Sequence, residues 1–221
     1  MARFVLEPVV RIASAPGAPE LLYHEMLSRP EVPSVAEFVR RISDLGASSY
    51  LDECMLQEAL DLASESGLII GCNIARQSLR SWEAILRRIG RSRSASSLII
   101  EITESGPDGA NERQWLALFS KGAKALGCRI AIDDAGCGAH AEEGLMRTLS
   151  IEPDIVKIDR TVIAQPEKLG ALARLAFSAG AIAVAEGVES DRDLQIAIGA
   201  GIQYAQGWMF SKPESRRKKL A

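Results

Sequence analysis

The sequence predicts an α/β fold, a variant TIM-type (β/α)8 barrel that begins with an antiparallel hairpin. Eight short apolar runs are spaced along 221 residues, a length suited to one barrel-sized domain. The last six runs are separated by stretches long enough for a crossover helix, which is the pattern of parallel strands. Eight strands are also the number that closes a small barrel. We therefore expect a single domain over residues 1–213.

The first two strands are expected to form the hairpin. An apolar run over residues 4–10, interrupted by Pro8, is followed by a turn rich in proline, and a second run covers residues 21–27. Their connection is too short for a parallel crossover, so the strands should pair antiparallel. Helices are expected next over about 34–45 and 50–64, because apolar residues recur at helical spacing and Ser34 with Glu37 forms a capping-box pattern.

From residue 67 onward, strands and helices alternate. The expected strands cover 67–73, 97–103, 128–133, 153–158, 181–186 and 202–206, and the expected helices cover 78–90, 111–126, 142–149, 167–179 and 190–199. Four glycines stand just before strands, where helix C-caps are expected: Gly67, Gly127, Gly180 and Gly201. Residues 214–221 are rich in Arg and Lys, and we expect them to form a disordered basic tail.

Composition excludes several classes of protein. The formal net charge of −3 argues against a protein that coats DNA or RNA, which would usually be basic. No apolar run approaches the roughly 20 residues of a membrane helix, and no secretory signal stands at the N-terminus. We therefore expect a cytoplasmic protein with no membrane partner. The four cysteines form no Cys-x-x-Cys pair and are expected to be reduced thiols, and the two histidines are too few for a typical zinc site.

Each of the six expected parallel strands ends on a polar or charged side chain. The C-terminal ends of parallel strands gather at one face of a barrel, where the active sites of such barrels lie. One Asn, four carboxylates, one Lys and one Gln should therefore meet in a single mouth: Asn73, Glu101, Asp133, Asp134, Lys157, Glu186 and Gln206.

These residue types favour a hard metal ion and an anionic substrate. Crowded carboxylates repel each other, and divalent cations are their natural neutraliser. Oxygen donors without histidine favour Mg²⁺, Mn²⁺ or Ca²⁺ over zinc or copper. The consecutive Asp133 and Asp134 can bridge two metals about 4 Å apart, and Lys157 can stabilise charge on a reacting phosphate or orient the attacking water. The pattern predicts two-metal hydrolysis of a phosphodiester.

Seven short fragments also resemble the EAL domain family, and they occur in the order of that family over nearly the whole chain. The fragments are Glu25-Met26-Leu27, Asn73-Ile74, Glu101-Ile102-Thr103-Glu104, Asp133-Asp134-Ala135-Gly136, Lys157-Ile158-Asp159, Glu186-Gly187-Val188-Glu189 and Gln206-Gly207. The resemblance implies a variant (β/α)8 barrel with an antiparallel early strand. It also implies hydrolysis of cyclic di-GMP to linear pGpG with two Mg²⁺ or Mn²⁺ ions, and a homodimer as an assembly to test for.

The resemblance further implies a role for each matching position. One metal ion would be held by Glu25, Asn73, Glu101 and Asp133, and the second by Asp133, Asp134 and Glu186. Three residues would support catalysis: Lys157 at the nucleophilic water, Gln206 in the same pocket, and Glu104 as a brace for the loop after Asp134. Four residues would serve the substrate side of the site. Arg29 would bind phosphate, and Glu7 would face the nucleotide. Asp159 and Glu189 would support the residues around it.

Two departures from the family pattern keep other functions open. Members commonly read Asp-Asp-Phe-Gly-Thr-Gly-Tyr-Ser-Ser, whereas the loop here, residues 135–142, reads Ala-Gly-Cys-Gly-Ala-His-Ala-Glu. In the family this loop couples metal binding to dimerisation. Glu7 replaces a glutamine and would repel phosphate unless it binds a guanine edge. One alternative is a catalytically weak or inactive EAL-like receptor or protein-interaction module. The other is a different metal-dependent barrel enzyme acting on small phosphorylated or enolisable acids.

Overall fold

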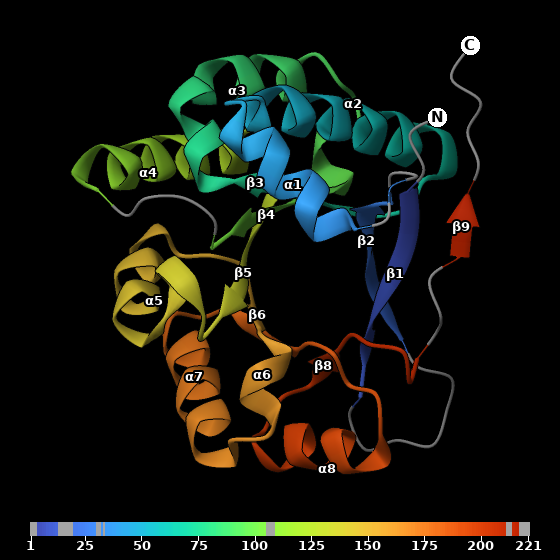
Figure 1. Cartoon of the computed structure of the whole chain (residues 1–221), viewed down its shortest axis with the longest axis vertical. Coiled ribbons are helices and arrows are strands. Elements are labelled where there is room, and N and C mark those ends of the chain that lie inside the picture. The colour runs from blue at the N-terminus through green and yellow to red at the C-terminus, as the bar shows by residue number, and fades with distance from the viewer. Residues whose placement is uncertain are drawn as a thin grey trace.

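The predicted barrel is present in the computed structural model, which describes residues 4–12, 20–29, 32, 34–104, 109–210 and 214–216. Strand β1 (Phe4–Arg11) pairs antiparallel with β2 (Leu21–Ser28). Parallel strands continue the ring from β2: β3 (Ile70–Ala75), β4 (Leu98–Thr103), β5 (Arg129–Ala135), β6 (Ile155–Ile158), β7 (Ile182–Ala185) and β8 (Tyr204–Ala205). Because β8 pairs with β1, the ring closes, as Figure 1 shows. The fold class and the hairpin are confirmed.

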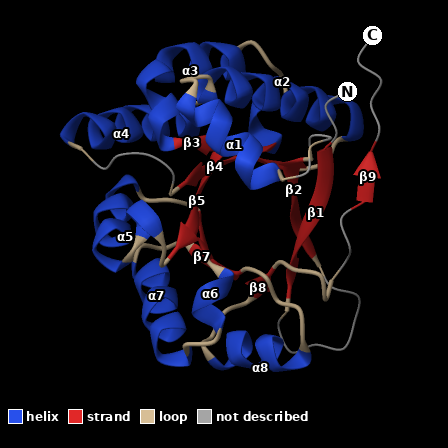
Figure 2. Cartoon of the chain, viewed as in Figure 1, coloured by secondary structure: helices blue, strands red, loops and turns tan. Residues whose placement is uncertain are grey.

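The helices lie outside the ring of strands, as Figure 2 shows. They are α1 (Val35–Asp44), α2 (Ser48–Ser66), α3 (Trp82–Gly90), α4 (Ala110–Ala125), α5 (Glu142–Thr148), α6 (Arg160–Ile163), α7 (Pro166–Ser178) and α8 (Asp191–Gly199). Of these, only the four-residue α6 was not expected. In the described part of the chain, none of the helices combines the length and the apolar character needed to span a membrane.

Local signals explain most of the boundaries. Gly67 ends α2 in a left-handed conformation with φ of 68°, so residue 67 belongs to the helix cap and not to the strand. Strand β3 begins at Ile70. Ser34 caps α1 by accepting a hydrogen bond from the Glu37 amide at 3.2 Å. The carboxylate of Glu37 pairs with Arg41.

The C-terminal segment differs from the expected disordered tail. Residues Glu214–Arg216 form strand β9, which pairs antiparallel with Phe4–Leu6. The physical reason is an open edge, because β8 pairs only with Val10 and Arg11 at the other end of β1. The expectation is therefore wrong for residues 214–216. Residues 217–221 and the proline-rich turn over 13–19 lie outside the described residues.

The interior of the barrel is layered by the two-residue period of its strands. Six apolar side chains from six strands fill a layer inside the ring: Val9, Tyr23, Ile99, Ala131, Ile155 and Val184. The alternate residues, such as Ile100 and Ile130, pack outward among the helices. Two positions beyond the interior layer, toward the C-terminal strand ends, the sequence places Glu25, Glu101, Asp133, Lys157 and Glu186. Strand geometry alone therefore stacks a charged layer on an apolar one.

One partly buried carboxylate on α2 makes the stability of this fold depend on pH. The Asp52 side chain accepts a hydrogen bond from the Ala75 amide at 2.9 Å, and burial raises its pKa from 3.8 to about 6. Because the pKa of Asp52 is higher in the folded than in the unfolded state, the protonated carboxyl group favours the folded state. This stabilisation is fully present below pH 4 and is lost as the pH rises through 6. We expect Asp52→Asn, which keeps the acceptor, to raise the free energy of unfolding by up to about 3 kcal/mol at pH 7.5 and to change it little at pH 4.

Urea denaturation of both proteins at the two pH values measures this difference. Asp44→Asn is the matched control, because the Asp44 side chain is 62% exposed at the end of α1. A stabilisation by Asp52→Asn of equal size at both pH values would contradict the assignment.

Candidate metal centre

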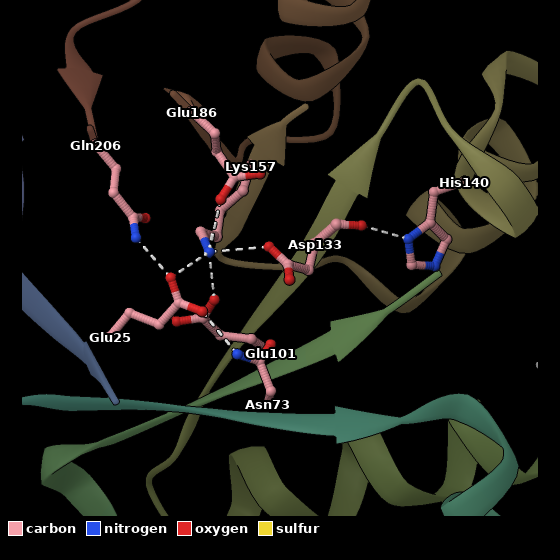
Figure 3. A network of polar contacts seen from close by, with 8 residues as sticks. All are labelled: Glu25, Asn73, Glu101, Asp133, His140, Lys157, Glu186 and Gln206. Carbon is pink, nitrogen blue, oxygen red and sulfur yellow. Dashed lines mark hydrogen bonds and ion pairs between the residues drawn. The ribbon is translucent and has the colours of Figure 1, made fainter. Parts of the chain in front are cut away.

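Lys157 lies at the centre of the charged layer. Its Nζ atom is 2.6 Å from Glu101 Oε2, 2.8 Å from Glu186 Oε1, 2.9 Å from Asp133 Oδ1 and 3.0 Å from Glu25 Oε2. Figure 3 shows the four carboxylates pointing at this one ammonium group, and they come from β2, β4, β5 and the residue after β7. The Lys157 side chain is 1% exposed, so water contributes almost nothing to its solvation. These contacts join residues up to 161 positions apart into one site.

Two amide side chains fix Glu25 in this cluster. Asn73 Nδ2 donates to Glu25 Oε1 at 2.6 Å, and Gln206 Nε2 donates to Glu25 Oε2 at 2.6 Å. The remaining oxygens of the amides, Asn73 Oδ1 and Gln206 Oε1, are buried, as is Glu101 Oε1, and none of the three has a hydrogen-bond partner among the described residues. Buried acceptors without a donor are costly, and a cation would satisfy them.

The electrostatics show an excess of negative charge. Burial lowers the pKa of Lys157, but the four carboxylates outweigh it and hold the pKa well above its ordinary value. Burial and neighbouring carboxylates raise the pKa values of Glu101, Asp133 and Glu186. Burial also opposes ionisation of Glu25, yet Lys157 and the two amides keep its pKa below the ordinary value. A single ammonium group therefore does not neutralise this layer.

The donor set fits a divalent cation. Glu25, Glu101 and Asp133 each offer a carboxylate oxygen, and these oxygens lie within 4.8 Å of one another. The unpartnered oxygens of Asn73 and Glu101 add neutral and charged donors to the same cluster. An all-oxygen set of this kind suits Mg²⁺, Mn²⁺ or Ca²⁺ rather than a metal that prefers nitrogen or sulfur.

Asp134 reaches the site through an irregularity in β5. Ile132 is opposite Val156 and Ala135 is opposite Ile158, so β5 has one residue more than β6 in this interval. The extra residue makes a β-bulge at Asp133 and Asp134, and Asp134 has a φ of 52°. Burial, then the charges of Asp133 and Glu104, raise the pKa of Asp134 to about 8. The second aspartate thus joins the acidic cluster.

Glu104 lies against the loop that follows this bulge. A β-carbon placed on Gly138 would come within 2.7 Å of Glu104 Cγ and 3.2 Å of Glu104 Cβ. Gly138 itself has a φ of 48°. Glu104 therefore packs closely on the loop, in the place where the sequence predicts a brace.

The predicted substrate residues lie around the cluster rather than in it. Glu7 is opposite Glu25 across the β1–β2 pair, and burial followed by the charge of Glu25 raises its pKa. Asp159 caps α6 by accepting from the Thr161 amide at 2.8 Å. The other two residues are exposed at the surface: Glu189 Oε1 is 3.4 Å from Arg160, and Arg29 donates to the Ser28 carbonyl at 3.1 Å.

Sequence reasoning missed one residue that contacts the site. His140 is fully buried, and its Nδ1 lies 2.6 Å from the backbone oxygen of Asp133. The available signal was a single histidine in a glycine-rich loop, and such a residue does not reveal a contact to a backbone atom seven positions earlier.

Comparison with known proteins identifies the family. The family model described as the EAL domain matches residues 3–213. The chain belongs to the EAL domain family. The cyclic di-GMP phosphodiesterase PdeF of Escherichia coli is 26% identical over 87% of this chain and 28% of its own length. The cyclic di-GMP phosphodiesterase RocR of Pseudomonas aeruginosa is 33% identical over 53% of this chain and 31% of its own length. The chain thus spans less than a third of either relative.

Solved structures agree with the fold. The FimX EAL domain from Pseudomonas aeruginosa bound to c-di-GMP superposes with a TM-score of 0.79 at 21% identity, over 96% of this chain and 90% of that one. Klebsiella pneumoniae BlrP1 in a calcium/cy-diGMP complex gives a TM-score of 0.79 at 23% identity, over 97% and 56% of the two chains. These EAL structures share the barrel architecture of this chain.

The close approach of Gly71 to the site generates a prediction. A β-carbon on Gly71 would collide with Glu101 Oε1 and lie 2.6 Å from Cε2 of the fully buried Tyr23. We expect Gly71→Ala to lower the free energy of unfolding by about 1–3 kcal/mol through overpacking, and to weaken Mn²⁺ binding by displacing Glu101. Urea denaturation and calorimetric titration with Mn²⁺ measure the two effects.

Gly199→Ala in α8 is the matched control, because nothing lies within 4 Å of the added methyl group. It should leave Mn²⁺ affinity unchanged. If the two alanine variants had the same unfolding free energy and the same Mn²⁺ affinity, the absence of a side chain at Gly71 would not be needed for the position of Glu101.

Proposed function

We propose that this EAL domain is a metal-dependent phosphodiesterase that hydrolyses cyclic di-GMP to linear pGpG with two Mg²⁺ or Mn²⁺ ions. The observation that carries the proposal is the buried cluster of carboxylates and amides around Lys157 at the C-terminal mouth of the barrel. The named activity of the relatives PdeF and RocR supports the same substrate.

The charge of the cluster favours two ions over one. Four carboxylates contact Lys157, those of Glu25, Glu101, Asp133 and Glu186, and the carboxylate of Asp134, which is close to Asp133, is a fifth. When all five are ionised, as metal ligands are, one ammonium group leaves four negative charges, which two divalent ions would balance. Glu25, Asn73, Glu101 and Asp133 would hold one ion, and Asp133, Asp134 and Glu186 the other. When bound, such ions supply Lewis acidity to the phosphodiester and to the attacking water.

The other residues of the chain have distinct roles in this proposal. Lys157 keeps a proton and a positive charge at the mouth, which stabilises charge that develops on the reacting phosphate. Gln206 and Asn73 hold Glu25 in one orientation by donating to both of its oxygens. Glu104 supports the loop after Asp134. Arg29, Glu7, Asp159 and Glu189 form the outer rim that would face or support the nucleotide.

A turnover assay tests the proposal directly. The purified chain is incubated with cyclic di-GMP and Mn²⁺ or Mg²⁺, and linear pGpG is followed by chromatography, with calorimetry on the same sample. Metal-dependent pGpG formation is the expected result. Nucleotide binding without product would instead identify a receptor, and neither binding nor product would indicate a protein-interaction module. Light scattering with and without metal tests for the homodimer.

Two substitutions should move the stability of the metal-free protein in opposite directions. Asp133→Asn removes one of several mutually repelling carboxylates, so we expect a higher urea midpoint, with Mn²⁺ affinity weakened by more than about a hundredfold. Lys157→Met leaves the carboxylates without their counter-ion, so we expect a loss of about 3–5 kcal/mol that Mn²⁺ reverses. Turnover should be lost in both variants.

The metal-binding readout separates the two roles. Calorimetric titration should show tight Mn²⁺ binding by Lys157→Met and none by Asp133→Asn. The opposite pattern would mean that the roles of the aspartate and the lysine are wrongly assigned.

A further inference from the structure

The loop between β5 and α5 folds back onto the strand it leaves. The Cys137 amide donates to the Asp134 carbonyl at 3.1 Å, and the His140 amide donates to the Cys137 carbonyl at 2.8 Å. The Gly136 amide donates to the His140 carbonyl at 2.8 Å, which closes the loop. This set of backbone hydrogen bonds returns residue 140 to the end of β5.

At that place the His140 ring makes a defined hydrogen bond. Its side chain is fully buried, and Nδ1 lies 2.6 Å from the carbonyl oxygen of Asp133, as Figure 3 shows. A carbonyl oxygen only accepts, so the hydrogen is on Nδ1 of His140 and the ring donates. The contact joins the loop to the backbone of a predicted metal ligand.

The bulge explains why this carbonyl needs a donor. The regular pairing between β5 and β6 stops after Ile132 and resumes at Ala135, so Asp133 and Asp134 lie outside the ladder. Asp134 also adopts a left-handed conformation, with a φ of 52°, which is uncommon for a residue other than glycine and is held by its surroundings. The peptide between the two aspartates sets the direction of both carboxylates.

We propose that His140 is a positioning residue, which anchors the Asp133–Asp134 bulge by donating from Nδ1 to the Asp133 carbonyl and so keeps both carboxylates directed into the metal site. The proposal deepens the proposed function and rests on it for the metal readout. It predicts that removing the Nδ1 donor weakens metal binding more than a change of side chain that keeps a donor at that position. Loss of the hydrogen bond should weaken metal binding while the hydrophobic core of the barrel stays packed.

A matched pair of variants isolates the hydrogen bond. Asn and Leu have side chains of the same branched shape, and only Asn carries a nitrogen donor at the position of Nδ1. We expect His140→Leu to weaken Mn²⁺ binding by about 10–100-fold, the range for losing a residue that orients a metal ligand, and His140→Asn to stay within about threefold of wild type. Calorimetry measures the affinity, and kcat and KM for cyclic di-GMP are measured at saturating Mn²⁺.

Hydrogen exchange in the metal-free protein provides a readout independent of the metal. Amides over residues 133–141 should exchange faster in His140→Leu than in His140→Asn or wild type. Ile89→Ala, a fully buried change on α3, is the control for general destabilisation and should not change exchange in this segment. If wild type binds no Mn²⁺, the proposed function fails, and the exchange data still decide the role of His140. Equal exchange in the Leu and Asn variants, or wild-type Mn²⁺ affinity in His140→Leu, would overturn the inference.

Discussion

The whole site depends on the ion pairs of Lys157 with four buried carboxylates. Burying an unpaired charge costs several kcal/mol, and the ammonium group of Lys157 lowers that cost for the carboxylates around it. Yet one positive charge against this many negative charges leaves an imbalance, visible in the raised pKa values of Glu101 and Glu186. The lysine thus offsets only part of the negative charge, and the remainder is what divalent ions would balance in the proposed function. An apolar interior is the more stable alternative to such a charged cluster, and in the proposed function cation binding is the compensation.

The parts of this arrangement that follow regular geometry could be predicted from sequence. An apolar run that ends on Glu101 or Lys157 reveals both the strand and the side chain that ends it, because the period of a strand decides which residues face inward. The short connection before β2 likewise fixed the antiparallel hairpin. Gln206 was expected at the mouth because its strand ends there, whereas Glu25, 181 positions away, was assigned to the same site only by the resemblance to the EAL family.

The parts that could not be predicted arise from irregular backbone or from edges. The strand β9 forms because β8 is too short to cover the whole second edge of β1, whose other edge pairs with β2. The bulge at Asp134 depends on a single extra residue between two paired positions. No hydrophobic pattern records such an insertion. The contact of His140 with the Asp133 carbonyl depends in turn on that bulge. The hydrophobic periodicity of the sequence predicts neither the bulge nor the contact.

The positions at which the chain departs from the family pattern are related to where its backbone is irregular. The ladder of β4, β6 and β7 places Glu101, Lys157 and Glu186, and all three have the residue type that the family motif requires. The departures are concentrated in residues 135–142, where the ladder is broken and the backbone takes its conformation from the loop's own hydrogen bonds. Supports of that kind can be built from different residues, because a backbone carbonyl accepts equally well from any donor that reaches it. A changed loop sequence is therefore compatible with an unchanged set of carboxylates, provided that some donor holds the Asp133 carbonyl in place.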